Sequence, residues 1–303
     1  MILFFKRPFA LFAKSVILLA DGLRSGRGVC SLFVSVFGAS RVLWKRGIGS
    51  AVVTAVLCGL VLLWKFGLSP FVLCTLVPGA VVLVASRVHA MMTAQEIYLR
   101  LLAVFYNELE ARRFIKQYEP VCQQKLSDRC RRTLQAHLAN AYAYAGDSEK
   151  ALSLISSLPI PEKKGRVDTQ LLIAGNTCIY KMMAGDVEGA RAAQAQMAEL
   201  LDVAKREHHK ISPNYDRTYQ TNQIQLDLAD GKPVDVTLVR EELSSRSNTL
   251  HKAVCRLLLA RIYAAAGKRA EARGVLKEVT GLKGDVVILA QARALQKELQ
   301  AEN

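Results

Sequence analysis

The sequence lacks the patterns that most often reveal chemistry. Its seven cysteines are an odd number without a Cys-x-x-Cys pair, which argues against a disulfide framework and against a zinc site. None of its five histidines has a second ligand at metal-binding spacing with a carboxylate between. A glycine-rich phosphate loop, a dinucleotide fingerprint and a Gly-x-Ser-x-Gly elbow are also missing. We therefore predict no catalytic residue, no cofactor and no metal, and a chain that is not an enzyme.

Acidic residues are nearly missing from the first 90 positions, which hold ten basic residues and one acid, Asp21. The whole chain of 303 residues has a formal net charge of +15, with 51% hydrophobic and 22% charged residues, so intrinsic disorder is excluded. Because the basic excess lies in the most apolar part, it favours an anionic membrane surface as a partner. Basic clusters further along are short and have acids close by. Nucleic-acid binding is therefore not predicted.

Two long runs in the N-terminal third contain no charge. Residues 47–64 and 66–86 number 18 and 21, with only Lys65 between them. A helix rises about 1.5 Å per residue, so each run is close to the roughly 30 Å of a bilayer core. Gly67 and Pro70 predict a tight turn after Lys65. We expect residues 47–87 to form a two-helix transmembrane hairpin; a pair of core helices in a soluble domain is the alternative.

Basic residues around the predicted hairpin indicate its orientation. Most precede it in residues 1–46, and Arg87 follows it, so the positive-inside rule places both termini in the cytoplasm. In residues 1–46, apolar side chains share a helical face while Lys14 lies opposite, which predicts a basic amphipathic segment at the membrane interface. The sequence thus predicts an integral membrane protein with two spans, whose residues 1–87 contact lipid.

The rest of the chain has helical periodicity, and a short pattern recurs in it. Residues Ala145–Ala151, Ala184–Ala190 and Ala266–Ala272 each begin with Ala-Gly, continue with polar residues and end with Ala. The glycine is expected to end one helix in the left-handed conformation, and the final alanine to let two helices approach closely. A weaker copy contains Gly231, with Val236 expected in the final position. The pattern predicts successive pairs of helices.

These copies resemble the tetratricopeptide repeat. Ala139 and Tyr142 in the first copy, and Ala260 and Tyr263 in the last, match its small and aromatic positions. The copies are 36 to 46 residues apart, more than the family's period of about 34. We expect the extra residues in loops at 160–168 and 205–215. The resemblance implies an all-α fold in which residues 92–303 form a cytoplasmic α-solenoid of helix pairs with a closing helix; an irregular helical bundle is the alternative.

The resemblance also implies a groove lined by the first helix of each pair. Its candidate residues are Asn140, Ile179, Gln225 and Arg261. Asn140 matches the asparagine with which some family members clamp a C-terminal carboxylate, but the other clamp positions do not match. We predict a membrane-anchored scaffold or adaptor that binds a protein or peptide partner in this groove. The alternatives are a structural subunit of a membrane complex and an uncharacterised membrane-associated enzyme; the oligomeric state is not indicated.

Overall fold

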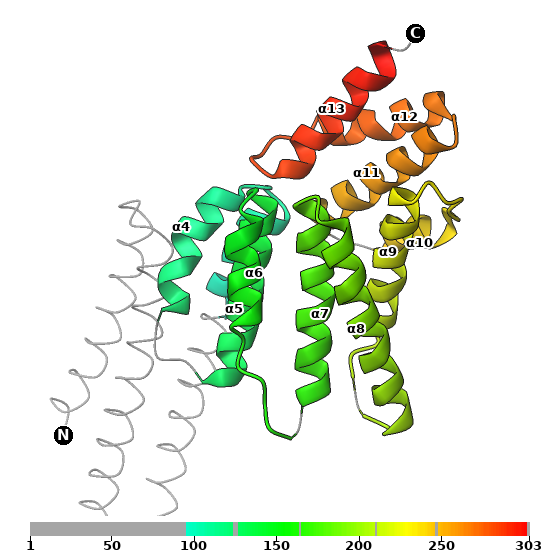
Figure 1. The fold of residues 1–303 in the computed structure, drawn as a ribbon. Helices are drawn as coiled ribbons and strands as arrows, with labels where there is room; N and C mark the ends of the chain where they lie inside the picture. Colours follow the sequence, from blue (N-terminus) through cyan, green and yellow to red (C-terminus); the bar gives the residue numbers. More distant parts are fainter. Residues whose placement is uncertain (1–94, 124–126, 164, 210, 246–247, 302–303) are drawn as a thin grey trace, which may run out of the picture. The chain divides into compact units, whose positions relative to one another are not determined.

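The computed structural model describes residues 95–123, 127–163, 165–209, 211–245 and 248–301, and all regular structure in them is helical, as predicted. After a helix over residues 95–106 come α4 (Ala111–Cys122), α5 (Asp128–Tyr144), α6 (Ser148–Ser156), α7 (Arg166–Met183), α8 (Val187–Arg206), α9 (Asn214–Ala229), α10 (Thr237–Ser245), α11 (Thr249–Ala265), α12 (Arg269–Thr280) and α13 (Val287–Ala301) (Figure 1).

The chain divides into two compact units, Met1–Leu101 and Leu102–Asn303. The predicted interface segment, residues 1–46, and the predicted hairpin, residues 47–87, lie outside the described residues. Among the helices that are described, none has the length and apolar character needed to cross a membrane. The features that follow belong to the second unit.

Neighbouring helices of the second unit pack against each other as pairs. Contacts join α5 to α6, α7 to α8 and α11 to α12, and the first helices of successive pairs also touch, α5 with α7, α7 with α9 and α9 with α11. Helical spacing explains the packing, because residues three or four apart share a face. On α8, for example, Met197 and Leu201 are buried and pack against Leu171 and Ala174 of α7.

The turn within each pair has the same backbone geometry in four places. In the first, the Asp147 N–H donates to the Tyr142 carbonyl (2.9 Å) and the Gly146 N–H to that of Ala143 (3.0 Å). These are the two bonds of a Schellman cap, which needs a residue with positive φ. The predicted left-handed glycines are confirmed, with positive φ at Gly146, Gly185, Gly231 and Gly267.

The second helix of the weak copy begins later than expected, so the prediction for Val236 is wrong. Val236 precedes α10 and is half-buried, whereas Val239 is 2% exposed and fills the core position. Pro233 disfavours a helical conformation at the residue before it. Asp235 then sets the start, since its carboxylate accepts from the backbone N–H (2.9 Å) and hydroxyl (2.7 Å) of Thr237. The expected loops are also shorter, ending before Arg166 and Asn214, where α7 and α9 begin.

The loop before α13 contacts the start of α4. The Asp285 carboxylate accepts from the backbone N–H groups of Ala111 (2.6 Å) and Arg112 (3.1 Å), and its own N–H donates to the Leu109 carbonyl (3.0 Å). Asp285 therefore caps α4 from 174 residues further along the chain. The predicted closing helix, α13, exposes the polar side chains expected on its outer face, Arg293, Lys297 and Glu298.

Candidate partner-binding site

The four residues predicted from the repeats lie on the first helices. Asn140 is on α5, Ile179 on α7, Gln225 on α9 and Arg261 on α11. Asn140, Ile179 and Gln225 are half-buried and Arg261 is exposed, so all four keep surface that a partner can touch. Their helices are neighbours in space. The structure therefore carries them on adjacent helices, and the contacts of Asn140 and Arg261 define what each can offer.

A hydrogen bond between two successive helix pairs holds the Asn140 side chain. The hydroxyl of Tyr180, a buried residue of α7, donates to Asn140 Oδ1 at 2.7 Å. Burial raises the pKa of Tyr180 well above its ordinary value of 10.0, so the phenol keeps its proton and acts as a donor. With its oxygen engaged, Asn140 presents an amide NH₂ group, a donor suited to a carbonyl or carboxylate oxygen.

Arg261 supplies a cation on α11, the last of the four first helices that carry the predicted residues. Its guanidinium donates to Gln291 Oε1 of α13 at 3.1 Å, and no acidic side chain among the described residues forms an ion pair with it. The surrounding helices desolvate the group and lower the pKa of Arg261 below its ordinary value, although an arginine stays charged at neutral pH. An accessible guanidinium without an acidic partner is suited to a carboxylate.

An aromatic and imidazole cluster near these residues was not predicted. The Tyr106 hydroxyl lies 2.9 Å from His137 Nδ1 on α5, and the Tyr106 ring stacks on His251 of α11 with centroids 5.8 Å apart. Burial lowers the pKa of His137 to about 4, so the ring is neutral at neutral pH and shares a hydrogen bond with the phenol. Tyr106 thus bridges two first helices. Sequence spacing gave no signal, because the three residues meet only through the packing of distant helices.

Two other groups of the second unit, the Cys178 thiol and the Tyr144 phenol, keep their protons at neutral pH. Burial raises the pKa of the Cys178 thiol to about 11 and that of Tyr144 to about 12. A protonated thiol is a poor nucleophile at neutral pH. Within the described ranges, no cluster of three or more His, Cys, Asp or Glu side chains could hold a metal ion. At these positions the arrangement supplies hydrogen bonds and packing.

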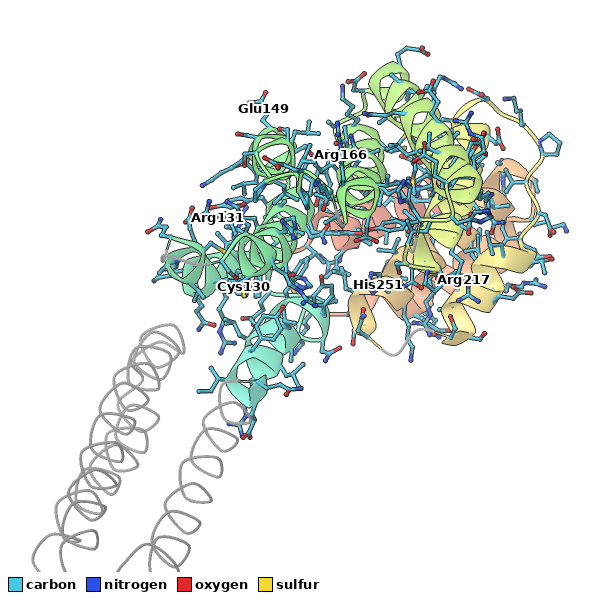
Figure 2. The ribbon with its side chains drawn as sticks, turned by 90° about the horizontal axis from the view of Figure 1, so that it is seen from below. Cys130, Arg131, Glu149, Arg166, Arg217 and His251 are labelled. Atoms are coloured by element: carbon cyan, nitrogen blue, oxygen red, sulfur yellow. The ribbon has the colours of Figure 1, made fainter. Side chains whose placement is uncertain are left out.

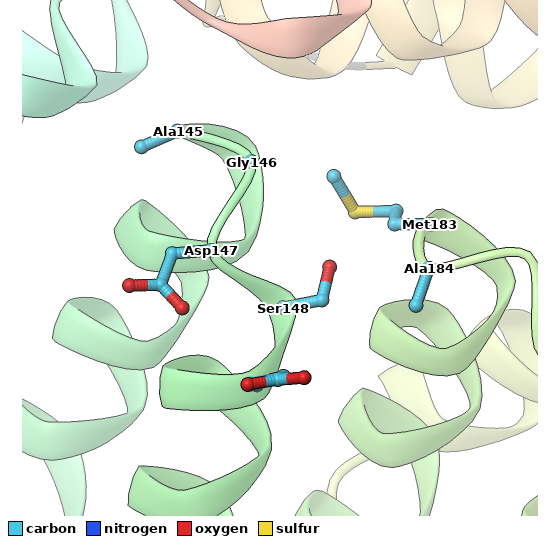
Figure 3. Close-up of a pocket in the computed structure, with 7 residues that line it drawn as sticks. Ala145, Gly146, Asp147, Ser148, Met183 and Ala184 are labelled. Atoms are coloured by element: carbon cyan, nitrogen blue, oxygen red, sulfur yellow. The ribbon is translucent and has the colours of Figure 1, made fainter.

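Two pockets lie beside the glycine turns, away from the four predicted residues. One, of about 520 Å³, is lined by residues 145–149 together with Met183 and Ala184 of the next pair. Figure 3 shows the Ser148 hydroxyl and the Met183 side chain beside the space between the two turns. A second of about 520 Å³ is lined by residues of α4, among them Lys116 and Glu119, by Tyr142 of α5, and by Ala145 and Asp147 of the first turn.

Comparisons of the chain with protein-family models, with curated proteins and with solved structures found no match. The best-defined members of the candidate site are Asn140, fixed by Tyr180, and Arg261, fixed by Gln291.

Proposed function

We propose that the chain is a membrane-anchored, non-enzymatic scaffold. In this proposal residues 47–87 form a transmembrane hairpin, and the remainder is a cytoplasmic, tetratricopeptide-like α-solenoid that binds a protein or peptide. The main support is the turn that recurs with the same two hydrogen bonds at Gly146, Gly185, Gly231 and Gly267. A recurring unit that packs on its neighbours is the basis of repeat scaffolds.

A second contact supports the alignment of the copies. The Tyr142 hydroxyl donates to Glu119 at 3.0 Å, and Arg240 donates to the Tyr263 hydroxyl. In both cases the partner lies 23 residues before the tyrosine, on the second helix of the preceding pair. The two tyrosines that match the aromatic repeat position thus make equivalent contacts between pairs. Equivalent positions with equivalent contacts are expected of repeats.

The first helices favour a partner rich in acceptor oxygens. Asn140 presents an amide NH₂ and Arg261 a guanidinium without an acidic partner among the described residues. Both are donors, so they suit backbone carbonyls and a carboxylate of a bound peptide. We expect the partner segment to carry at least one acidic residue or a free C-terminus that contacts Arg261.

Affinity capture after cross-linking in native membranes tests this surface. The full chain carries Arg261→Glu, and the matched control carries Lys277→Glu on α12, an exposed lysine without an ion pair among the described residues. At least one partner captured by the wild type should fall by about tenfold or more with Arg261→Glu, the loss expected from one charge-assisted contact. The control should not change. Identical partner lists from the wild type and both variants would contradict partner binding at the surface of the first helices.

Cysteine labelling tests the membrane anchor. In a chain whose native cysteines are replaced by alanine, a cysteine at Ser69 should react with an impermeant reagent from outside, and one at Ser157 should react only after permeabilisation. The reverse pattern would invert the orientation. Extraction of the chain by alkaline carbonate would show that it has no transmembrane anchor.

A further inference from the structure

The connections from α6 to α7 and from α8 to α9 lie at one edge of the second unit (Figure 1). A nitrogen of the Arg132 guanidinium donates to the Pro159 carbonyl (3.4 Å), which joins the start of α5 to the connection between α6 and α7. The Tyr215 hydroxyl donates to the Asp168 carbonyl (2.8 Å), which joins the start of α9 to that of α7. Figure 2 views the molecule from this side, with Arg131 and Arg166 labelled. We call residues 128–132, 157–163, 165–168 and 205–209 the loop edge.

The loop edge carries exposed cations without an ion-pair partner, together with three exposed acids, Asp128, Glu162 and Glu207. Four of its basic residues are exposed and form no ion pair with any described residue: Arg129, Lys163, Arg166 and Arg206. Arg129 and Arg166 lie in the first turns of α5 and α7. The positive end of the helix dipole disfavours a cation at such positions. Helix stability therefore does not account for Arg129 and Arg166, whereas Arg206 lies in the last turn of α8, where the dipole favours a cation. An anion outside the chain would pair with Arg129 and Arg166.

The loop edge also presents an apolar side chain to solvent. Ile160 is 49% exposed, and within the described residues of the second unit it is the large apolar side chain with substantial exposure. Pro159 and Pro161 flank it, and their rings restrict the backbone on both sides. A single exposed isoleucine is ordinary by itself. Here it projects from the connection that also carries Lys163 and that contacts Arg132.

We propose that the loop edge docks on an anionic membrane surface. Cations with a neighbouring apolar side chain are the combination that binds the lipid interface, where the bases face headgroup phosphates and carboxylates and the apolar group enters between them. Ile160 is the inserted group, and the four bases contact the headgroups. This proposal rests on the proposed anchor, which would keep the second unit at high local concentration beside the bilayer.

An RNA backbone would also attract the four bases, but the loop edge is less suited to it. Single-stranded RNA is usually held by stacking on aromatic side chains. The loop edge contains no phenylalanine, tyrosine or tryptophan. An exposed aliphatic side chain between prolines gains little from a sugar-phosphate chain and more from a lipid interface. The lipid surface is therefore the occupant that the side chains favour.

Quenching by brominated lipid tests the docking in the full chain. The chain carries Ile160→Trp, with its native Trp44 and Trp64 replaced by phenylalanine, and is reconstituted into vesicles of phosphatidylcholine alone or mixed with phosphatidylserine. The control carries Glu149→Trp, an exposed position beside the first glycine turn. We expect quenching at position 160 that requires phosphatidylserine and weakens as salt rises. Position 149 should remain unquenched in both lipids.

A pair of substitutions separates charge from insertion. Arg129→Gln with Arg166→Gln should lower the ratio of docked to undocked chains by roughly 30-fold, because each base near an anionic surface contributes about fivefold. Lys277→Gln with Lys297→Gln removes two exposed bases outside the loop edge and should leave the ratio unchanged. Equal effects of the two pairs would overturn the proposal.

Further outcomes separate the docking of the loop edge from its alternatives. Equal quenching at positions 160 and 149, or quenching at 160 without phosphatidylserine, would contradict docking of the loop edge. If RNA changed the tryptophan emission at position 160 and brominated lipid did not quench it, the ligand of the loop edge would be nucleic acid and not a lipid surface. Extraction by alkaline carbonate would refute only the anchor, since quenching at position 160 by added vesicles is measured independently.

Discussion

The two edges of the second unit differ in how many of their basic side chains form ion pairs. Beside the glycine turns, at residues 145–150, 181–191 and 227–235, cations have acidic partners: Lys181 with Asp186 (2.8 Å), Lys232 with Asp230 (2.9 Å), and Arg191 also with Asp230. We call these residues the turn edge. On the loop edge, four exposed bases have no such partner among the described residues. The turn edge thus uses its cations in ion pairs. The loop edge has two paired bases, Arg131 with Asp128 and Lys205 with Asp216, and four exposed bases that remain available to a ligand.

The backbone also differs between the edges, since it is regular at the turn edge and irregular at the loop edge. Three glycine turns, at Gly146, Gly185 and Gly231, repeat the same caps at the turn edge. The connections at the loop edge have different lengths, since 157–165 links α6 to α7 and 207–213 links α8 to α9. Constrained turns preserve the fold, while variable connections can acquire a separate role. Stability should therefore respond to changes at the turn edge much more than to changes at the loop edge.

The largest loss of stability is expected at Gly284, where the last loop meets the turn before α4. Gly284 has a φ of +142°, and a Cβ there would lie 2.6 Å from the Leu109 carbonyl oxygen. Gly284→Ala should reduce the free energy of unfolding by about 3 kcal/mol or more, through backbone strain and steric overlap. Urea unfolding of the reconstituted chain measures it. Gly281→Ala is the control, because a Cβ there meets only the Lys277 carbonyl oxygen at 3.6 Å.

The next largest effect is expected from His137, in the interior between the edges. Its pKa is lowered from 6.5 to about 4 in the folded chain, so the unfolded chain binds the extra proton between these values. Stability should decrease as pH falls through this window, by up to about 3 kcal/mol. His137→Gln keeps a hydrogen-bonding side chain beside Tyr106 that does not titrate, and should flatten this part of the profile. If the stability of the wild type and of His137→Gln changed with pH in the same way, His137 would not be a buried, neutral imidazole.

The turn edge should add a separate response in stronger acid. Arg191 and Lys232 hold the pKa of Asp230 well below its ordinary value of 3.8. The stabilisation by Asp230 is therefore complete above that value and is lost as pH falls below it. Asp230→Asn should change only this lower range, and a change between pH 6.5 and 4, the range assigned to His137, would contradict the assignment.

Substitutions of two glycines, one in the last glycine turn and one in α12, should change the free energy of unfolding by smaller amounts and in opposite directions. Gly267 has a φ of +72° in its turn, so Gly267→Ala should destabilise the chain by about 1–2 kcal/mol. Gly274 lies inside α12 with open space around its Cβ position, so Gly274→Ala should stabilise it by about 0.5–1 kcal/mol. Thermal unfolding of both variants measures the difference. The same sign for both would show that the turn does not require its left-handed residue.

The smallest effect on stability is expected at the loop edge. Arg166 lies at the start of α7, where an acid is favoured over a base, so Arg166→Glu should stabilise the fold by about 0.3–1 kcal/mol. The same change should weaken lipid docking, because it replaces a cation by an anion. Unfolding and brominated-lipid quenching are measured on the same preparation. A clear loss of stability would show that Arg166 has a structural role.

Local patterns made the helices and their turns predictable from the sequence. Apolar spacing predicted the all-α fold, and the Ala-Gly pairs predicted the left-handed caps. Local chemistry also caused the error at Val236, since Pro233 and Asp235 move the start of α10 and bring Val239 into the core. The transmembrane hairpin stays a prediction.

The candidate site was predictable only in part. The repeat pattern placed Asn140 and Arg261 on first helices, but not the hydrogen bonds to Tyr180 and Gln291 that hold them. Those partners lie 40 and 30 residues away, and their approach depends on how whole helices pack. The bridge from Tyr106 to His137 and His251 has the same origin. Periodicity identifies the face of a helix, whereas it does not identify the side chain that the face will meet.

The cap that Asp285 provides for α4 has a consequence for how the second unit folds. In an open repeat array each pair contacts only its neighbours, so the ends can fray separately. Here the first pair obtains its cap from a residue 174 positions later, so this bond forms only after nearly all of the unit has been synthesised. Closing so long a loop is slow and costly in entropy. The second unit should therefore complete its folding late and, once closed, unfold as one cooperative body instead of opening from either end.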